Sequence, residues 1–344
     1  MRTRASRGSD PRWQPTLATV AAAAGVSSAT VSRVVNGVPT VLPAHRQAVQ
    51  DAISLLGYVP NRAARSLVTR RTGHIALVVR EPVEFGVSDP YVSSLIVATS
   101  QCLAEMGGHL VVMMAREDTD HAAAGEYVRA GHIDGALLVS LHVDDPLPEQ
   151  LLQARVPVVV GGRPPTGLDG LSFVDVDNVG GGRLACERLV AQGRTRIAMI
   201  AGPADMAAAQ DRLSGFRAAV VEAGLDPDLV ARGDFTRASA ESATEELLAR
   251  YPDIDGIFAA SDMMALGVLR VLRMSGRAVP GDVSVIGFDD VDAARYAEPP
   301  LTTIKQPIGE QARAMLESLL QQVRGEGHPA SVTLPTSLVV RESG

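Results

Sequence analysis

The chain has 344 residues, of which 46% are apolar, and a formal net charge of −7. This length exceeds one ordinary domain, so we expect two or three compact units with well-filled cores. No apolar run approaches the ~20 residues of a membrane span, and no signal-peptide core follows the arginine-rich start. The composition excludes membrane-embedded classes, and we expect a soluble, cytoplasmic protein with no membrane partner.

The charge is distributed unevenly along the chain. Residues 1–71 contain ten arginines against Asp10 and Asp51, a net +8, whereas residues 72–344 carry −15. A basic head on an acidic body indicates that only the head meets a polyanion. A solvated tail explains the arginines of residues 1–14, which we expect to be disordered, but not those that lie among apolar residues further on.

Two short helices are predicted at the start of residues 15–59. The first has Thr16 as its N-cap and ends at Gly25, because glycine adopts the left-handed conformation of a tight turn at low cost. Ser27 caps the second, which runs to Asn36.

The second helix has an unusual outer surface. Its valines form an apolar face and leave Ser28, Ala29, Ser32 and Arg33 pointing outward. A solvated surface helix would usually carry Glu and Lys pairs, whereas small side chains and one arginine allow a helix to lie in a DNA major groove. A purely structural helical hairpin is the alternative.

A third helix is predicted from about Pro43 to Leu56, and Gly57 ends it. The stretches "TLATVAAAAGVSSATVSRVVNG" and "LGYVPNRAARSL" resemble the headpiece of the lactose-repressor/galactose-repressor family, in which a helix-turn-helix precedes a hinge helix. One departure is Leu42, where the family usually has a small hydroxyl cap. The resemblance implies base contacts from Ser28, Ala29 and Arg33, and backbone contacts from Thr16, Ser27, Thr30, Ser32 and Asn36.

Residues 60–71 are expected to form the hinge helix and a linker. The segment from Asn61 to Leu67 is shorter than the ~12 residues that an isolated helix needs, so its order must come from what it binds. The resemblance implies that two hinges pair on DNA, with Leu67 as a wedge in the minor groove and Ala64 packed beside it. A plain linker is the alternative.

Residues 72–344 alternate short apolar runs with stretches of helical period, which predicts parallel α/β units. The strand candidates fall into two successive sets, so we expect two similar lobes that face a cleft. Those candidates are Ile75–Val79, Leu110–Met114, Gly135–Val139, Pro157–Val160, Arg196–Ala201, Gly256–Ala260 and Val283–Gly287. The helix candidates include Val92–Met106, Gly181–Ala191, Leu213–Ala223 and Ser239–Arg250.

Open parallel sheets bind ligands at the carboxyl ends of their strands. Arg212, next to a helix, suits a clamp on a hydroxyl pair or a carboxylate, and Phe235 offers an apolar plate for a ring. Polar residues follow two further strands, namely Ser261, Asp262, Asp289 and Asp290. Taken singly, each is more often a cap, a turn residue or a surface charge, but together they predict a ligand site.

The family resemblance extends over the body in "VDVDNVGGGRLACERLVAQGRTRIAMIAGP", "RLSGFRAAV", "FAASDMMALGVLRVL" and "VPGDVSVIGFDDVDAARYAEPPLTTIKQP". It implies a periplasmic-binding-protein-like effector domain of two lobes, about 72–173 with 303–332 and 174–302 with 333–344. Many members have Asn at Ser261 and an acid at Gly162, so fewer polar groups reach the ligand here. The implied effector-binding residues are Asp89, Arg212, Phe235, Ser261, Asp289 and Gln306.

Several patterns argue against an enzyme. The stretch "GGGRLA" from Gly180 fits a dinucleotide fingerprint only weakly, because its glycines also suit a close helix-sheet contact. Lys305 is the only lysine and no glycine-rich loop precedes it, and no catalytic or zinc-spaced motif is present. We expect no catalytic residues, cofactor or metal, and buried thiols at Cys102 and Cys186.

We therefore predict an all-α helix-turn-helix headpiece with a hinge helix, followed by an α/β effector domain with parallel sheets. We expect the protein to be a transcriptional regulator, and specifically a repressor. It should bind a pseudo-palindromic double-stranded operator as a homodimer, and a sugar-like effector should control this binding. Two rivals are a transport-type sugar-binding protein and a sugar-metabolising enzyme with a DNA-binding appendage. The first would need an export signal and the second a base or nucleophile in the cleft.

Overall fold

The computed structural model describes residues 15–35, 37–58, 71–81, 89–115, 118–164, 168, 170–326 and 331–344. The chain divides into two compact units, Met1–Thr72 and Gly73–Gly344, which we call the head and the body. In the part described, no single helix is long and apolar enough to cross a membrane; the first two helices pass that test only jointly and are bent by 104°.

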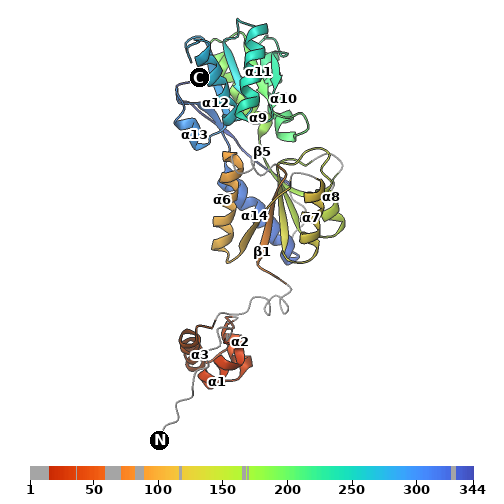
Figure 1. Cartoon of the computed structure of the whole chain (residues 1–344), viewed down its shortest axis with the longest axis vertical. Coiled ribbons are helices and arrows are strands. Elements are labelled where there is room, and N and C mark those ends of the chain that lie inside the picture. The colour runs from red at the N-terminus through yellow and green to blue at the C-terminus, as the bar shows by residue number, and fades with distance from the viewer. Residues whose placement is uncertain are drawn as a thin grey trace. The chain divides into compact units, whose positions relative to one another are not determined.

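The described residues of the head form three helices, α1 (Leu17–Ala24), α2 (Ser28–Val35) and α3 (Pro43–Leu56) (Figure 1). The predicted cap of α1 is confirmed: the Thr16 hydroxyl accepts a hydrogen bond from the Thr19 amide at 3.3 Å. Its predicted end is confirmed as well, because Gly25 has φ 66° in the left-handed region.

The predicted start of the second helix is also confirmed. The Ser27 hydroxyl accepts from the Thr30 amide at 3.2 Å and so caps α2. Leu42 makes no capping hydrogen bond, yet α3 still begins after it, because the fixed φ of Pro43 suits a first helical turn. The three helices enclose a small core whose fully or nearly buried members are Val20, Ala21, Val31, Val34, Val49, Ala52 and Tyr58.

The first lobe of the body is a six-stranded, all-parallel sheet in the order β11-β5-β4-β3-β1-β2. Its strands are β1 (His74–Val79), β2 (His109–Met114), β3 (Gly135–Val139), β4 (Val158–Gly161), β5 (Ser172–Val176) and β11 (Ser331–Leu334). Alternate residues of a strand face opposite sides of a sheet, so strands covered on both sides read as continuous apolar runs. Accordingly, Ile75 and Leu77 pack in one core and Ala76 and Val78 in another.

Helices cover both faces of this sheet (Figure 1). α6 (Pro90–Glu105) and α14 (Ile308–Arg324) pack together on one face, and α7 (Asp118–Arg129) and α8 (Leu147–Gln153) lie on the other. Cys102 and Cys186 are both free and buried, as predicted.

The second lobe has a six-stranded sheet in the order β12-β10-β9-β8-β6-β7. Its strands are β6 (Ile197–Ala201), β7 (Val230–Arg232), β8 (Gly256–Ala259), β9 (Ser284–Asp289), β10 (Thr302–Lys305) and β12 (Ser337–Val339). The sheet is parallel except at one edge, where β12 runs antiparallel to β10.

The helices of the second lobe pack in two pairs. One pair is α9 (Asn178–Ala191) with α10 (Ala207–Glu222), and the other is α11 (Arg237–Arg250) with α12 (Asp262–Met274). The pairs cover opposite faces of the sheet, since Phe288 lies against α9 and the neighbouring Gly287 lies against α12. A short helix, α13 (Asp292–Arg295), follows β9.

The glycines of "GGGRLA" lie inside α9, where they permit close packing. A Cβ on Gly181 would be 2.6 Å from the Phe288 ring, and a Cβ on Gly182 would be 2.2 Å from the Arg212 carbonyl oxygen. The expected helix-sheet contact is therefore present at Gly181, and Gly182 adds a helix-helix contact with α10.

The chain crosses between the lobes three times, after β5, β10 and β11. All three crossings lie later than the expected boundaries. β5 stays in the first sheet up to Val176, because Asp177 then caps α9, and β10 stays in the second sheet up to Lys305. The last crossing follows Leu334 rather than residue 332.

Candidate functional site

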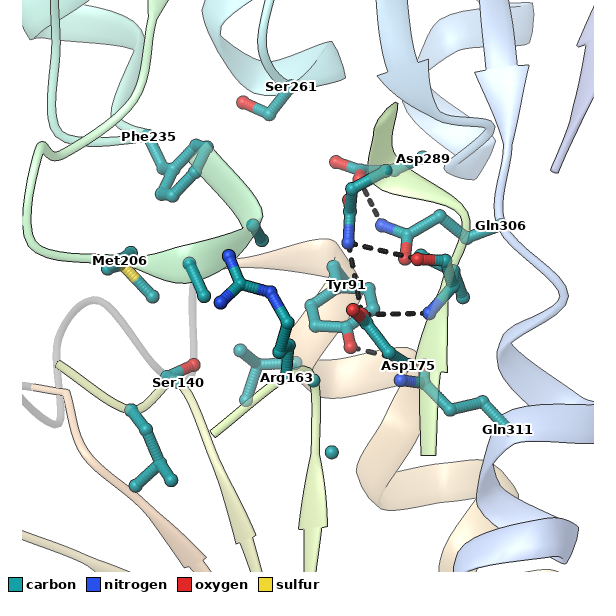
Figure 2. A pocket seen from close by; sticks show the side chains of 18 of the residues that line it. Tyr91, Ser140, Arg163, Asp175, Met206, Phe235, Ser261, Asp289, Gln306 and Gln311 are labelled. Carbon is teal, nitrogen blue, oxygen red and sulfur yellow. Dashed lines mark hydrogen bonds between the residues drawn. The ribbon is translucent and has the colours of Figure 1, made fainter. Parts of the chain in front are cut away.

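A cleft of about 790 Å³, including its open mouth, lies between the two lobes (Figure 2). It is lined at the ends of parallel strands, where open α/β sheets place their ligands. All six predicted effector-binding residues line this cleft, namely Asp89, Arg212, Phe235, Ser261, Asp289 and Gln306.

Arg212 is the buried cation of the cleft. It lies within the second turn of α10 rather than beside a helix as predicted, because α10 begins at Ala207, six residues earlier than expected. Its side chain donates to the Asn178 side-chain oxygen at 2.9 Å and to the Ala260 carbonyl at 2.5 Å. The guanidinium carbon also lies 3.6 Å from the centre of the Phe288 ring. These contacts fix the guanidinium in one orientation.

Asp289 faces this arginine at the end of β9. One of its oxygens lies 3.7 Å from the Arg212 Nη1 atom, and the same oxygen accepts a hydrogen bond from Gln306 at 2.6 Å. Burial raises the pKa of Asp289 to about 7, and the nearby arginine and the Gln306 hydrogen bond only partly oppose that rise. The backbone has φ 120° here, a strained conformation for a residue with a side chain.

Phe235 and Ser261 come from the second lobe (Figure 2). Phe235 follows β7 with φ 67° and presents its ring near Arg212, whose guanidinium carbon is 5.8 Å from the ring centre. The Ser261 hydroxyl accepts from the Met264 amide at 3.2 Å and caps α12, so its proton is left to donate.

Two further carboxylates that were predicted at the strand ends, Asp262 and Asp290, do not line the cleft. Asp262 is fully buried, where it accepts hydrogen bonds from the Thr303 hydroxyl at 2.5 Å and the Val291 amide at 2.9 Å. Asp290 pairs with Arg341 at 2.5 Å. Both serve the internal structure of the second lobe.

Asp89 has a structural role as well as its place in the cleft wall. Its side chain caps α6 by accepting from the Tyr91 amide at 2.7 Å and the Val92 amide at 3.2 Å. Burial nevertheless raises its pKa above the ordinary value.

A further set of polar residues that line the cleft was not predicted from the sequence. Asp175, on β5, accepts from the Asn178 side chain at 3.0 Å, and burial raises its pKa to about 6. The Tyr91 hydroxyl donates to Gln311 at 3.2 Å. The signal for Asp175 was present in "VDVDN", but β5 itself was not predicted.

Two ion pairs join the lobes near the mouth of the cleft. Arg163, after β4, makes a two-pronged contact with Asp211 on α10 at 3.0 and 2.8 Å. His142, after β3, lies 2.6 Å from Asp205 of the second lobe, and its contacts with Glu81 and with Asp205 raise the pKa of His142. Neither pair was predicted.

The head places its predicted base-reading residues on one exposed surface. Ser28, Ala29 and Arg33 are exposed on α2, whereas Thr30 and Ser32 are half-buried. Thr16 and Ser27 are the helix caps described above. The predicted contacts at Asn36, Asn61, Ala64 and Leu67 lie outside the described residues.

Comparison with known proteins places this architecture in a family. Residues 16–61 match the model for bacterial regulatory proteins of the lacI family, and residues 186–344 match that for a periplasmic binding protein-like domain. The transcriptional regulator CelR of Thermobifida fusca is 50% identical over 338 residues, which cover 97% of this chain and 99% of that protein. This chain belongs to the lacI family.

Solved structures of lacI-family proteins agree with this assignment. A CelR-cellobiose complex is 48% identical, with a TM-score of 0.77 over 96% of this chain and 100% of its own. A lac repressor dimer bound to operator and an anti-inducer is 28% identical, with a TM-score of 0.83 over 96% and 99%. The predicted family and fold class are confirmed, and this lacI-family chain is a DNA-binding transcriptional regulator, not an enzyme.

Proposed function

We propose that this lacI-family protein is a repressor that binds a pseudo-palindromic operator as a homodimer. A glucose disaccharide of the cellobiose type, bound in the cleft, controls its operator affinity. A CelR that is 48% identical to this chain has been solved with cellobiose, and this chain covers all of that structure. As a regulator of transcription, it works in the cytoplasm, where the chromosome is.

The charges that line the cleft favour a neutral ligand over an anionic one. Arg212 is surrounded by Asp89, Asp175 and Asp289, and Arg163, the other arginine of the wall, is paired with Asp211. An anionic ligand such as a sugar phosphate would therefore meet three carboxyl groups and, among the described residues, no unpaired cation. A neutral saccharide instead receives hydrogen bonds from Arg212 and Ser261 and donates its hydroxyl protons to Asp289. Phe235 offers the apolar face on which a pyranose ring packs.

We propose that α2 of each protomer enters a major groove, with the two grooves about 34 Å apart, one duplex turn. Ser28, Ala29 and Arg33 read base edges, and Thr16, Ser27, Thr30, Ser32 and Asn36 contact the backbone. The exposure of the first three on a helix without acidic residues supports this assignment. Asn61, Ala64 and Leu67 form the hinge contact with the minor groove.

The test combines ligand binding with operator binding. We expect cellobiose to raise the melting temperature of the wild-type protein, because a ligand that binds the folded state stabilises it, and to change its operator affinity. Arg212→Ala and Asp289→Ala should abolish both responses and retain operator binding. The control is Arg217→Ala, which removes an exposed arginine from the same helix and should respond like the wild type.

Normal responses in both cleft variants would show that the effector binds elsewhere. A screen of other neutral sugars and nucleosides in the same melting assay covers the case in which the cleft is right and cellobiose is not its ligand. If no such compound shifts the melting temperature, the proposed effector class is wrong.

A further inference from the structure

A second hollow of about 440 Å³, including its opening, adjoins the cleft. Both lobes contribute to its wall, which consists of Leu141, His142, Val143, Arg163, Pro164, Asp205, Ala207 and Gln210. Three of these residues, Leu141, Arg163 and Ala207, also line the cleft. The two spaces are therefore neighbours, and these three side chains form the partition between them.

Arg163 is the long side chain of this partition, and it is held in place. Figure 2 shows it extending from the first lobe toward Met206 of the second. Its Nε and Nη2 atoms donate to the two carboxylate oxygens of Asp211 at 3.0 and 2.8 Å. A bidentate contact of this kind fixes both the position and the plane of the guanidinium.

The neighbouring contacts keep the two walls at this separation. The Val143 amide donates to the Asp205 carbonyl at 2.9 Å, and His142 lies 2.6 Å from the Asp205 carboxylate. Arg163 therefore lies between two lobes that are also held together by the contacts of Asp205 with His142 and Val143. A ligand that extends from the cleft into the hollow must first displace its guanidinium from Asp211.

The hollow beyond Arg163 could receive another sugar ring. Leu141, Val143 and Pro164 provide apolar surface, and Val143 is 52% exposed. Gln210 supplies a polar edge, and the charges of His142 and Arg163 are matched by Asp205 and Asp211. The chemistry of this wall suits a neutral saccharide unit, as does that of the cleft.

We propose that Arg163, held by Asp211, determines the length of saccharide that this regulator accepts. With the pair formed, the cleft ends at Arg163 and takes a disaccharide; with the pair removed, cleft and hollow join and a third ring fits. This inference rests on the proposed saccharide effector. It assigns Arg163 a role in specificity and Asp211 a role in positioning Arg163.

Calorimetric titration of the full-length protein with cellobiose and with its three-glucose homologue tests this directly. The wild type should bind the disaccharide more tightly, by about tenfold or more. In Arg163→Ala this preference should disappear or reverse, because the third ring no longer meets the guanidinium. Asp211→Ala should reduce the preference in the same direction, since its Arg163 is free to swing aside.

The matched control is Arg183→Ala. Arg183 makes the same two-pronged contact with Glu222, which also lies on α10, but both partners belong to the second lobe and neither lines the cleft. Its preference between the two saccharides should equal that of the wild type. Unchanged operator affinity without sugar would show that each variant is folded.

The possible results distinguish a failure of the length limit from a failure of the proposed effector. If the wild type binds cellobiose but Arg163→Ala keeps the wild-type preference, the length limit is wrong and the effector stands. The same conclusion holds if the wild type binds both saccharides equally well. If the wild type binds neither, the length limit fails and cellobiose is not the effector, and the melting-temperature screen of other neutral sugars then decides the effector class.

Discussion

Burial gives the carboxyl group of Asp289 a raised pKa that could not be predicted from its position in the sequence. It is 6% exposed and its pKa is about 7, so it exchanges a proton in the neutral range. Its partners Arg212 and Gln306 favour the charged form, but they do not fully offset the loss of water. The carboxyl group that we propose accepts hydrogen bonds from the sugar is thereby kept at the expense of stability.

The stability of the apo protein should therefore depend on Asp289 and pH. Folded Asp289 keeps its proton up to about pH 7, whereas the unfolded group, with a pKa near 3.8, has lost it. Its contribution to the free energy of unfolding should fall as pH rises between these values. Asp289→Asn lacks this term, so thermal unfolding from pH 5 to pH 8 should show the variant gaining stability relative to wild type as pH increases. A difference that does not vary with pH would contradict the shift.

At the scale of elements, the cleft depends on the close contact between α9 and α10. A Cβ on Gly215 of α10 would be 1.9 Å from the Val179 carbonyl oxygen, and one on Gly182 of α9 would meet the Arg212 carbonyl. Both obstacles are backbone atoms, which cannot rotate away. The glycines thus set the position of the helix that carries Arg212 and Asp211.

Gly215→Ala should move α10 away from α9. We expect a loss of about 1–3 kcal/mol in the free energy of unfolding, the usual cost of overpacking, together with weaker saccharide binding. Gly309→Ala is the matched control, because Gly309 lies in α14 with nothing within 4 Å of an added Cβ. Denaturant unfolding and calorimetry check both effects, and equal behaviour of the two variants would rule out the packing role.

The elements that the sequence predicted are those with strong local patterns. β1 and β3 are continuous apolar runs, and the caps at Thr16 and Gly25 are local signals. β5 was missed because Asp175 interrupts its apolar run, and β7 because it has only three residues. Residues at strand ends led to Arg212 and Asp289, but the pairing of Arg163 with Asp211, 48 residues away, depends on how the lobes meet.

At the scale of the whole molecule, function requires that events in the body reach the head. Effector binding and operator binding must be coupled by the same factor in both directions, typically worth 1–3 kcal/mol. Because a homodimer has two clefts, the factor by which saturating cellobiose changes operator affinity should equal the product of the factors by which operator changes cellobiose affinity at the two clefts. Fluorescence anisotropy with labelled operator and calorimetry on the complex measure the two sides, and a mismatch between them would exclude this linkage.

The hinge gives this coupling a specific test. Leu67→Ala should lose specific operator affinity, because the proposed minor-groove wedge is shortened, while cellobiose affinity of the free protein stays as in wild type. Leu55→Ala makes the same substitution at an exposed position of α3, 74% exposed, and should change operator affinity little. Wild-type operator affinity in Leu67→Ala would rule out the wedge.

The three crossings between the lobes restrict how this protein can be divided or recombined. Each lobe is assembled from separate stretches of the chain, since α14 and β11 return to the first lobe and β12 returns to the second. No single cut within the body yields an intact lobe, so neither lobe can be produced as a contiguous fragment. The boundary near residue 72 is different, because one join there exchanges a complete unit. Chimaeras made at that point should combine the operator preference of one family member with the effector preference of another.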